Sequence, residues 1–265
     1  MNKINSTLNA STFQKNTGML VGYLVAGYPE KHDFFDIIKK CEESGMDIFE
    51  IGFPSNDPYG DGEIIQKAHK MVDREEVRQI EYWRLIRKTT SKPIWIMAYK
   101  EDFIDTKVYL NLAKEHLMDA IVIPNCSQQE RQVIGKELAP YKVDVLGFVN
   151  PTMDKKEWEE CFLQFSLVYL QLYSGLSGMN VESEQYEELL HEALQHEDVK
   201  PFAGFGIKTP DRAKALIKKG FTGAIVGTAM IKQLNYSAEQ LYNYVSEMKK
   251  GVLGQGDEDE VCSEF

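Results

Sequence analysis

The sequence has no long apolar run, either along its length or near its start. Of its 265 residues, 43% are hydrophobic, yet no run approaches the ~18–20 apolar residues that a bilayer-spanning helix needs. The segment 1–17 is polar and lacks the apolar centre of a secretory signal. These absences predict a protein with no membrane anchor and favour the cytoplasm.

Cysteine and positive charge are also scarce. The four cysteines (Cys41, Cys126, Cys161 and Cys262) lie far apart, without the spacing of a Cys-x-x-Cys pair or a Cys/His metal site. This pattern indicates free thiols in a reducing compartment, with no disulfide framework and no bound metal. The formal net charge of −11 argues against nucleic acid as a partner. A phosphorylated small molecule is compatible with that charge, because backbone N–H groups and helix N-termini bind phosphate without a basic surface.

The chain does contain a regular alternation of apolar, β-rich runs with amphipathic stretches. The apolar runs span 19–25, 46–51, 93–98, 120–123, 143–149, 166–172, 201–205 and 224–226. Helical spacing occupies 34–41, 64–68, 77–87, 108–116, 130–138, 155–162, 183–194, 211–219 and 241–248. Strands separated by helices of this length predict βαβ units and a parallel sheet. Eight such units favour an α/β fold of the (β/α)8 TIM barrel type over an open doubly wound sheet, which has about five or six strands.

The same alternation predicts the domain organisation. No linker or low-complexity segment interrupts residues 1–250, which we therefore expect to form a single barrel domain. Residues 251–265 differ, because Gly-Gln-Gly is followed by consecutive acids at 257–260. We expect this acidic tail to be disordered.

Two acidic residues follow the second predicted strand. Glu50 lies where this apolar strand ends, and Asp61 lies in the glycine- and proline-rich loop after it. Taken singly, each has a simple explanation, as an acid closing a strand or an Asp capping a helix. However, an ionisable group at the end of a buried strand needs a reason, and the strand C-termini form the active site of a TIM barrel. We therefore predict that one acid carries protons and that the other is a charged hydrogen-bond acceptor.

Two glycine-rich turns near the end of the chain indicate a phosphate site. The segment 204–210 follows the seventh predicted strand, and 223–230 runs from the eighth strand into a helix that starts near Thr228. Glycine lets the backbone approach an anion closely, and a helix N-terminus presents N–H groups to it. Either turn alone is compatible with a tight bend. Together they predict a phosphate site, because many such barrels bind phosphate at the loops after strands seven and eight.

With these motifs, the chain resembles the tryptophan synthase α subunit family from about Gly18 to Met248. The family's pattern of an acid, Gly, Pro, Asp-Pro, Asp-Gly and Gln is kept, with its spacing, at Glu50, Gly52, Pro54, Asp57-Pro58, Asp61-Gly62 and Gln66. The loop 175–178 and both phosphate turns also lie where the family has them. The resemblance implies a TIM-barrel lyase of L-tryptophan biosynthesis, which cleaves indole-3-glycerol phosphate to indole and glyceraldehyde 3-phosphate by a retro-aldol reaction.

The resemblance also implies roles for individual residues. Glu50 would shuttle protons to ring carbon C3 and from the glycerol hydroxyl, while ionised Asp61 would accept the indole N–H. The residues implied for the indole pocket and its lid are Tyr23, Met97, Tyr99, Phe148, Tyr169, Ser177, Phe205 and Ile225. Those implied for the phosphate are Gly178, Gly204, Gly206, Gly227 and Thr228. Barrel packing is the alternative role for the pocket residues, and for Met97 and Ile225 it explains the residue about equally well.

The family's pyridoxal phosphate lies in the β subunit of an α2β2 complex, so the resemblance implies no cofactor in this chain. Several positions depart from the family pattern. Ser55 and Asn56 replace Phe-Ser, and Glu101 and Asp102 follow Tyr99 where the family has a small residue and Asn nearby. Because these loops help form the face that meets the β subunit, we expect weaker or more selective pairing. Three other functions remain open: a stand-alone indole-releasing lyase, an isomerase or epimerase of another phosphorylated substrate, and a catalytically weak activator of a partner.

Overall fold

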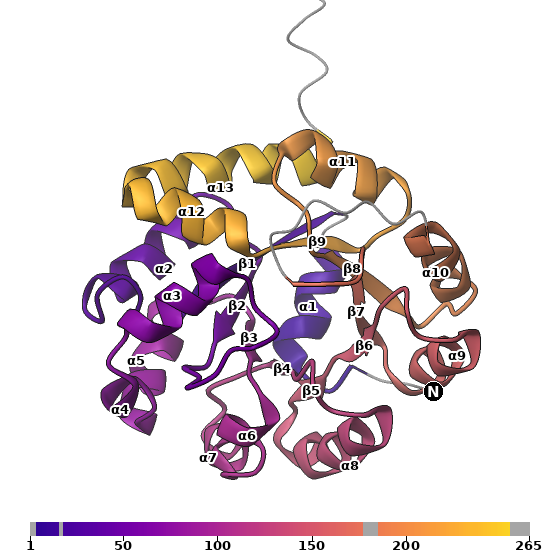
Figure 1. Ribbon diagram of the computed structural model, residues 1–265, viewed down its shortest axis with the longest axis horizontal. Coiled ribbons are helices and arrows are strands. Elements are labelled where there is room, and N and C mark those ends of the chain that lie inside the picture. The colour runs from indigo at the N-terminus through magenta and orange to yellow at the C-terminus, as the bar shows by residue number, and fades with distance from the viewer. Residues whose placement is uncertain (1–3, 16–17, 177–184, 255–265) are drawn as a thin grey trace, which may run out of the picture.

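Parallel strands form one sheet that curves into a barrel (Figure 1). The computed structural model describes residues 4–15, 18–176 and 185–254. The strands are β1 (Met19–Val25), β2 (Ile48–Gly52), β3 (Ile94–Met97), β4 (Ala120–Val122), β5 (Asp144–Val145), β6 (Gly147–Val149), β7 (Leu167–Gln171), β8 (Lys200–Gly204) and β9 (Gly223–Val226). Their order in the sheet is β5-β4-β3-β2-β1-β9-β8-β7-β6. The predicted α/β class and TIM-barrel architecture are confirmed.

The fifth predicted strand, 143–149, completes the barrel but is divided at Leu146. Its first half, β5, pairs with β4, whereas its second half, β6, pairs with β7. Leu146 itself stays on the β4 side, because its N–H donates to the Ile121 carbonyl (3.0 Å). The two end strands of the sheet order are therefore successive halves of one strand, and the division between them brings the sheet round on itself.

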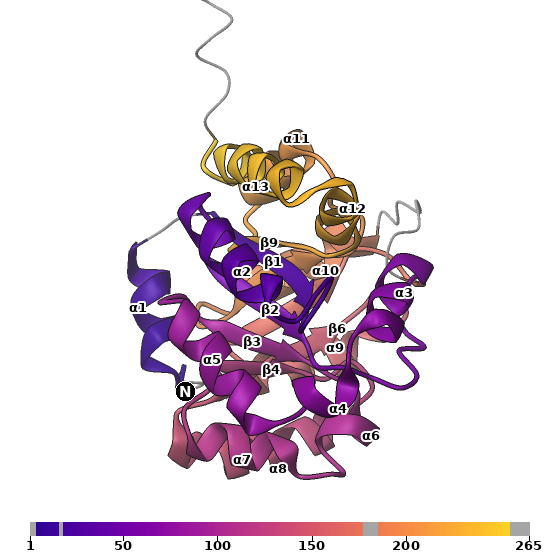
Figure 2. The same cartoon turned by 90° about the vertical axis from the view of Figure 1, so that its left-hand side faces the viewer.

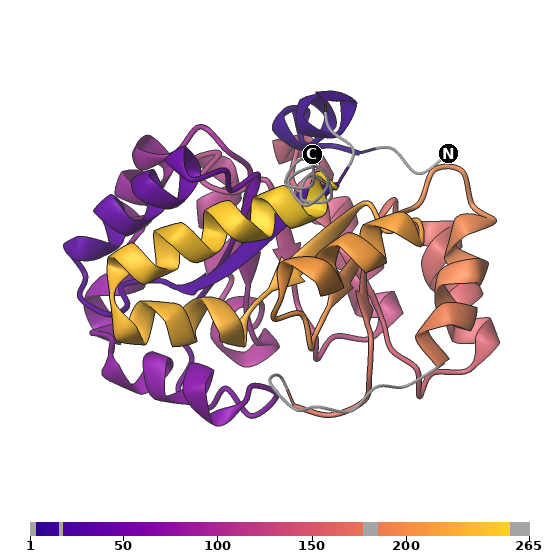
Figure 3. The ribbon, with the colours of Figure 1, turned by 90° about the horizontal axis from the view of Figure 1, so that it is seen from above.

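Helices surround the barrel (Figures 1 and 3). They are α1 (Thr7–Lys15), α2 (Asp33–Glu43), α3 (Glu63–Met71), α4 (Arg74–Val77), α5 (Ile80–Thr89), α6 (Lys100–Phe103), α7 (Val108–Lys114), α8 (Gln128–Leu138), η1 (Ala139–Tyr141), α9 (Lys155–Gln164), α10 (Gln185–Leu194), α11 (Pro210–Lys218), α12 (Thr228–Tyr236) and α13 (Ala238–Val252). Capping boxes begin α8 at Ser127 and α9 at Asp154. Among the described residues, no helix is long and apolar enough to cross a membrane.

The helix α1, which the sequence patterns did not predict, covers the N-terminal end of the barrel (Figure 2). Asn9 accepts a hydrogen bond from the Trp95 indole N–H (3.0 Å) and donates to the Asp144 carboxylate (2.8 Å). Phe13 packs against Phe202 of the inner apolar cluster, with 5.8 Å between ring centroids. With this end filled, a site inside the barrel has to open at the opposite end, where the strands reach their C-termini.

The last helix runs past the boundary expected at residue 250. α13 continues to Val252, and both Gly251 and Val252 are buried. α13 packs against α11 and α12 on the outside of the barrel (Figure 3). The remainder of the predicted acidic tail, from residue 255 onward, lies outside the described residues.

Candidate active site

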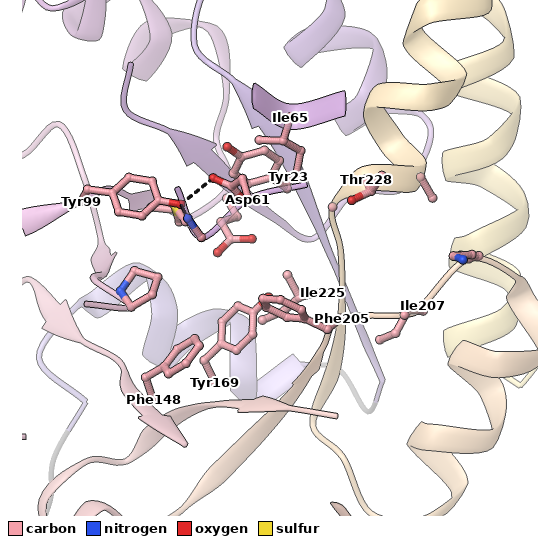
Figure 4. Close-up of a pocket in the computed structure, with 18 residues that line it drawn as sticks. Tyr23, Asp61, Ile65, Tyr99, Phe148, Tyr169, Phe205, Ile207, Ile225 and Thr228 are labelled. Atoms are coloured by element: carbon pink, nitrogen blue, oxygen red, sulfur yellow. Dashed lines mark hydrogen bonds between the residues drawn. The ribbon is translucent and has the colours of Figure 1, made fainter. Parts of the chain in front are cut away.

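A pocket opens at the C-terminal ends of the strands, and Figure 4 shows its lining residues. It holds about 720 Å³ of empty space, counting its open mouth. Its lining residues are Tyr23, Glu50, Gly60, Asp61, Ile65, Met97, Tyr99, Pro124, Phe148, Tyr169, Phe205, Gly206, Ile207, Lys208, Ile225, Gly227, Thr228 and Ala229. Both predicted catalytic acids therefore lie in one pocket with most of the predicted indole and phosphate residues.

Asp61 is held in the loop between β2 and α3 by a tyrosine that follows β3. The Tyr99 hydroxyl donates to Asp61 Oδ2 (2.9 Å) and accepts from the Gly60 N–H (3.1 Å). The side-chain amide of Gln66 donates to the Asp61 carbonyl (2.8 Å). Burial raises the pKa of Asp61 to about 7, although the Tyr99 hydrogen bond acts in the opposite direction. Tyr99 thus favours the ionised form of Asp61.

Glu50 lies on β2 and is 3% exposed. Burial first, and then the negative charge of Asp61, raise the pKa of Glu50 to about 8. The Tyr99 hydrogen bond favours the charge on Asp61, and that charge in turn favours the protonated form of Glu50. A neutral acid beside an anion provides the two roles that proton transfer and charge stabilisation need.

Tyr23 links the acid pair to a buried histidine. The pairing of β1 with β2 aligns Tyr23 with Glu50, so both side chains point to the same side of the sheet. The Tyr23 hydroxyl lies 3.1 Å from His69 Nε2, and the Ser55 N–H donates to His69 Nδ1 (3.2 Å). Because Nδ1 accepts, the ring proton lies on Nε2 and is donated to Tyr23. Burial lowers the His69 pKa to about 4, which keeps the ring neutral.

Aromatic side chains form an apolar slot across from Asp61 (Figure 4). Phe148 and Tyr169 stack with 5.2 Å between centroids and 29° between ring planes. Phe205 meets Tyr169 edge-on, at 6.2 Å and 81°. Rings arranged in these ways pack well against a further flat aromatic group.

The turns after β8 and β9 form the other end of the pocket. Phe205 and Gly206 both have positive φ (73° and 74°), and a Cβ on Gly206 would lie 2.8 Å from the Tyr173 ring. Thr228 begins α12, with Gly227 as the N-cap residue. The Thr228 Oγ1 is buried and has no hydrogen-bond partner among the described residues. A helix N-terminus with such a hydroxyl is suited to binding an anion.

Three predicted residues are not part of the described lining. Gly204 ends β8, and a Cβ there would lie 2.2 Å from the Tyr169 ring. The absence of a side chain at Gly204 therefore makes room for Tyr169, which does line the pocket. Ser177 and Gly178 lie outside the described residues.

The lining also includes residues that the sequence motifs did not single out: Gly60, Ile65, Pro124, Ile207, Lys208 and Ala229. Most of them are close in the sequence to motif residues, and this closeness could have identified them. Pro124 belongs to no motif. Of the lining residues that the structure describes, Lys208 alone carries a positive charge, and it belongs to the turn after β8. Within residues 4–15, 18–176 and 185–254, no group of three or more His, Cys, Asp and Glu is placed to hold a metal ion.

Comparisons with known proteins agree with this geometry. The family model for the tryptophan synthase alpha chain matches residues 10–256. The alpha chain of Methanosarcina acetivorans is 29% identical over 251 residues, covering 91% of both chains. That of Aquifex aeolicus is 27% identical over 250 residues, covering 90% of this chain and 95% of its own. A solved structure of Mycobacterium tuberculosis tryptophan synthase shares the fold, with a TM-score of 0.83 at 22% identity, covering 96% of this chain and 99% of that chain. The chain therefore belongs to the tryptophan synthase alpha chain family.

Proposed function

We propose that this pocket cleaves indole-3-glycerol phosphate to indole and glyceraldehyde 3-phosphate. As a member of its family, the chain is a carbon–carbon lyase of L-tryptophan biosynthesis. The observation that carries the assignment of the reaction to this pocket is its pair of buried acids. Burial raises the pKa of both carboxyls toward neutrality, and the charge of Asp61 raises that of Glu50 further, so the pair can hold one proton and one negative charge.

The reaction breaks the bond between indole C3 and the adjacent glycerol carbon. Protonated Glu50 gives its proton to C3, which leaves positive charge on the ring nitrogen. Ionised Asp61 accepts the ring N–H and stabilises that charge. The electrons of the breaking bond then return to the ring, while the hydroxyl on the leaving carbon gives its proton to Glu50 and becomes the aldehyde. Glu50 regains its proton, and no redox step occurs.

The lining supports a substrate orientation with the ring in the aromatic slot and the phosphate at the two turns. Tyr23, Met97, Tyr99, Phe148, Tyr169, Phe205 and Ile225 would surround the indole. Gly206, Gly227 and Thr228 would bind the phosphate through backbone N–H groups and the Thr228 hydroxyl. Lys208 would add a positive charge at that end. Roles for Ser177 in the lid and Gly178 at the phosphate stay predictions, and Gly204 would act by placing Tyr169.

We further infer that the chain works with a tryptophan synthase β subunit in an α2β2 complex. This inference is supported by its relatives, which are named alpha chains. Pyridoxal phosphate would belong to that partner. A cytoplasmic location is supported by the free, buried thiols of Cys41, Cys126 and Cys161. We also propose that the barrel is a single domain. It ends at about Val252, where α13 ends, and the acidic tail follows it.

The test is release of indole from indole-3-glycerol phosphate by the purified chain, with and without a β subunit. Glu50→Gln and Asp61→Asn should each lower kcat by at least about a thousandfold while leaving substrate binding near normal, because shape is kept and the titratable group is lost. Asp144→Asn is the matched control, since Asp144 is also a buried carboxyl but lies at the opposite end of the barrel. Substantial activity in either active-site variant would remove this mechanism. Turnover of another phosphorylated substrate, without indole release, would favour an isomerase or epimerase.

A further inference from the structure

The loop that carries Asp61, residues 53–62 between β2 and α3, is held at both of its ends by one short segment. At the end near α3, the Tyr99 hydroxyl bonds Gly60 and Asp61. At the end near β2, Ser55 Oγ donates to Asp102 Oδ2 (2.6 Å). Tyr99 is the N-cap residue of α6, and Asp102 lies within α6. The third βα unit therefore fixes the second loop at two points.

Arg78 strengthens the end of the loop near β2. Its Nη2 donates to Asp102 Oδ1 (2.5 Å), and its Nη2 and Nε both donate to the Pro54 carbonyl (2.6 and 3.0 Å). The guanidinium also lies 5.7 Å from the centroid of the Phe53 ring. The side chains of Arg78 and Asp102 are 28% and 12% exposed, so water screens this ion pair less than it screens a pair on the open surface.

Ser55 connects this ion pair to the pocket. It is 1% exposed, its N–H donates to His69 (3.2 Å), and its hydroxyl accepts from the Asp57 N–H (3.2 Å). His69 in turn contacts the hydroxyl of Tyr23, which lines the pocket. A continuous series of hydrogen bonds thus leads from the pocket wall through His69 and Ser55 to Asp102.

Ser55 and Asp102 are two positions at which the sequence departs from the family pattern. A hydroxyl buried at 55 would cost free energy without a partner, and so would a carboxylate shielded from water at 102. Each satisfies the other. The two departures are therefore one structural feature, in which the chain supplies its own support for the loop.

We propose that Asp102 is a positioning residue for the cleavage reaction: by holding Ser55 and Arg78, it fixes the loop that orients Asp61 toward the substrate ring. This proposal rests on the proposed function of Asp61. Asp102 does not line the pocket, so it acts on the substrate indirectly, by fixing the loop. The support comes from within the chain and needs no partner subunit.

The first test compares steady-state kinetics of Asp102→Ala with the wild-type chain. We expect kcat to fall about 10- to 100-fold and KM to stay nearly unchanged, because small displacements of a catalytic group slow the chemistry more than they weaken phosphate binding. Asp102→Asn keeps an acceptor for Ser55 and should recover part of kcat. The matched control is Glu115→Ala, which breaks the pair (2.6 Å) between Arg84 of α5 and Glu115, the C-cap residue of α7, and should leave kcat within about twofold.

The second test needs no substrate. Hydrogen exchange of residues 53–62 should be faster in Asp102→Ala than in the wild-type chain and unchanged in Glu115→Ala. The Ser55→Ala/Asp102→Ala double variant should lose less kcat than the product of the two single losses, because both single changes remove the Ser55–Asp102 contact. Unchanged kcat in Asp102→Ala, or an equal loss in Glu115→Ala, would overturn the proposal. If the wild-type chain releases no indole, the proposed function fails, and the exchange rates still decide whether Asp102 fixes the loop.

Discussion

At the scale of single residues, the site depends on Asp61 losing its proton before Glu50 does. Both carboxyls are buried, so burial opposes the charge on each. Two effects separate them: the Tyr99 hydroxyl donates to Asp61 and favours its ionised form, and the charge of Asp61 raises the pKa of Glu50. The sequence contained both acids at the right spacing, and the family resemblance implied that Asp61 is the ionised one. The structure adds a physical cause, the hydroxyl of Tyr99, which follows β3 and lies beside the loop.

The same pair predicts the pH dependence of cleavage. Activity requires Asp61 ionised, above about pH 7, and Glu50 protonated, below about pH 8, so kcat/KM should be bell-shaped and narrow. Tyr99→Phe removes the hydrogen bond that lowers the Asp61 pKa, and should move the acid limb upward by about 1 pH unit. Tyr59→Phe is the control, because its ring lies 4.9 Å from that of Tyr99 and is half exposed. An acid limb at the same pH in wild type and Tyr99→Phe would contradict this assignment.

Glu50 also predicts how stability depends on pH. The folded protein keeps this proton up to about pH 8, whereas the unfolded chain loses it near the ordinary value of 4.5. Between these values the folded state binds more protons, so the free energy of unfolding falls as pH rises. Glu50→Gln removes this effect and should be more stable than wild type at pH 9, by on the order of a few kcal/mol. Calorimetric Tm values at pH 5 and pH 9 check it. An equal Tm difference at both pH values would show that Glu50 does not titrate in this way.

At the scale of helices and strands, prediction succeeded where burial of apolar side chains decides the structure. All seven residues of β1 are buried, so its apolar run was a sufficient signal. α1 has no continuous apolar stripe. Polar contacts, such as those of Asn9 with Trp95 and Asp144, hold much of it in place instead. α6 has four residues, too few for a helical period to show. Periodicity cannot find helices of either kind.

The first turn of α12 allows a test of the phosphate end of the pocket. The Thr228 hydroxyl lies at its first turn without a hydrogen-bond partner among the described residues. Thr228→Val keeps the shape and removes a buried polar group, so it should leave stability unchanged or raise it by up to about 1 kcal/mol. If this hydroxyl binds the phosphate, KM should nevertheless rise by about tenfold. Thermal unfolding and steady-state kinetics of the same preparation measure both effects.

The control for Thr228→Val is Ser237→Ala, at the N-cap of α13, which should lower stability without affecting phosphate binding. Ser237 accepts from the Gln240 N–H (3.1 Å), so its loss should cost about 1 kcal/mol of stability. KM should not change. A KM for Thr228→Val equal to that of wild type would place the phosphate elsewhere.

At the scale of the whole molecule, the sequence was informative about the barrel and the position of its site, and less informative about contacts between loops. The strand C-termini of a TIM barrel meet at one end, so residues from the strand ends and the turns after β8 and β9 could be grouped before the structure was known. The contact between Ser55 and Asp102 joins residues 47 positions apart in the chain. No local pattern reports such a pair, because it depends on how two loops lie against each other.

The same loops bear on how the molecule meets a β subunit. Asp102 is 12% exposed, and its charge is already paired with Arg78, so it adds little free charge to this face. Glu101 is exposed and accepts from the Asn125 side chain (2.9 Å). Burying its carboxylate against an apolar partner would cost desolvation. We therefore expect weak or selective pairing with a generic β subunit, and Glu101 rather than Asp102 as its main cause.

Titration of a generic β subunit into the chain, followed by indole production and size-exclusion chromatography, measures this pairing. Glu101→Asn removes the charge and should tighten the complex by about 10-fold or more, because an unpaired charge is costly in an interface. Asp102→Asn should change affinity little, since its carboxylate is satisfied within the chain. A tight one-to-one complex with strong activation of the wild-type chain would show that Glu101 does not hinder docking. The face that meets the β subunit would then have to exclude Glu101, or supply a cation to pair with it.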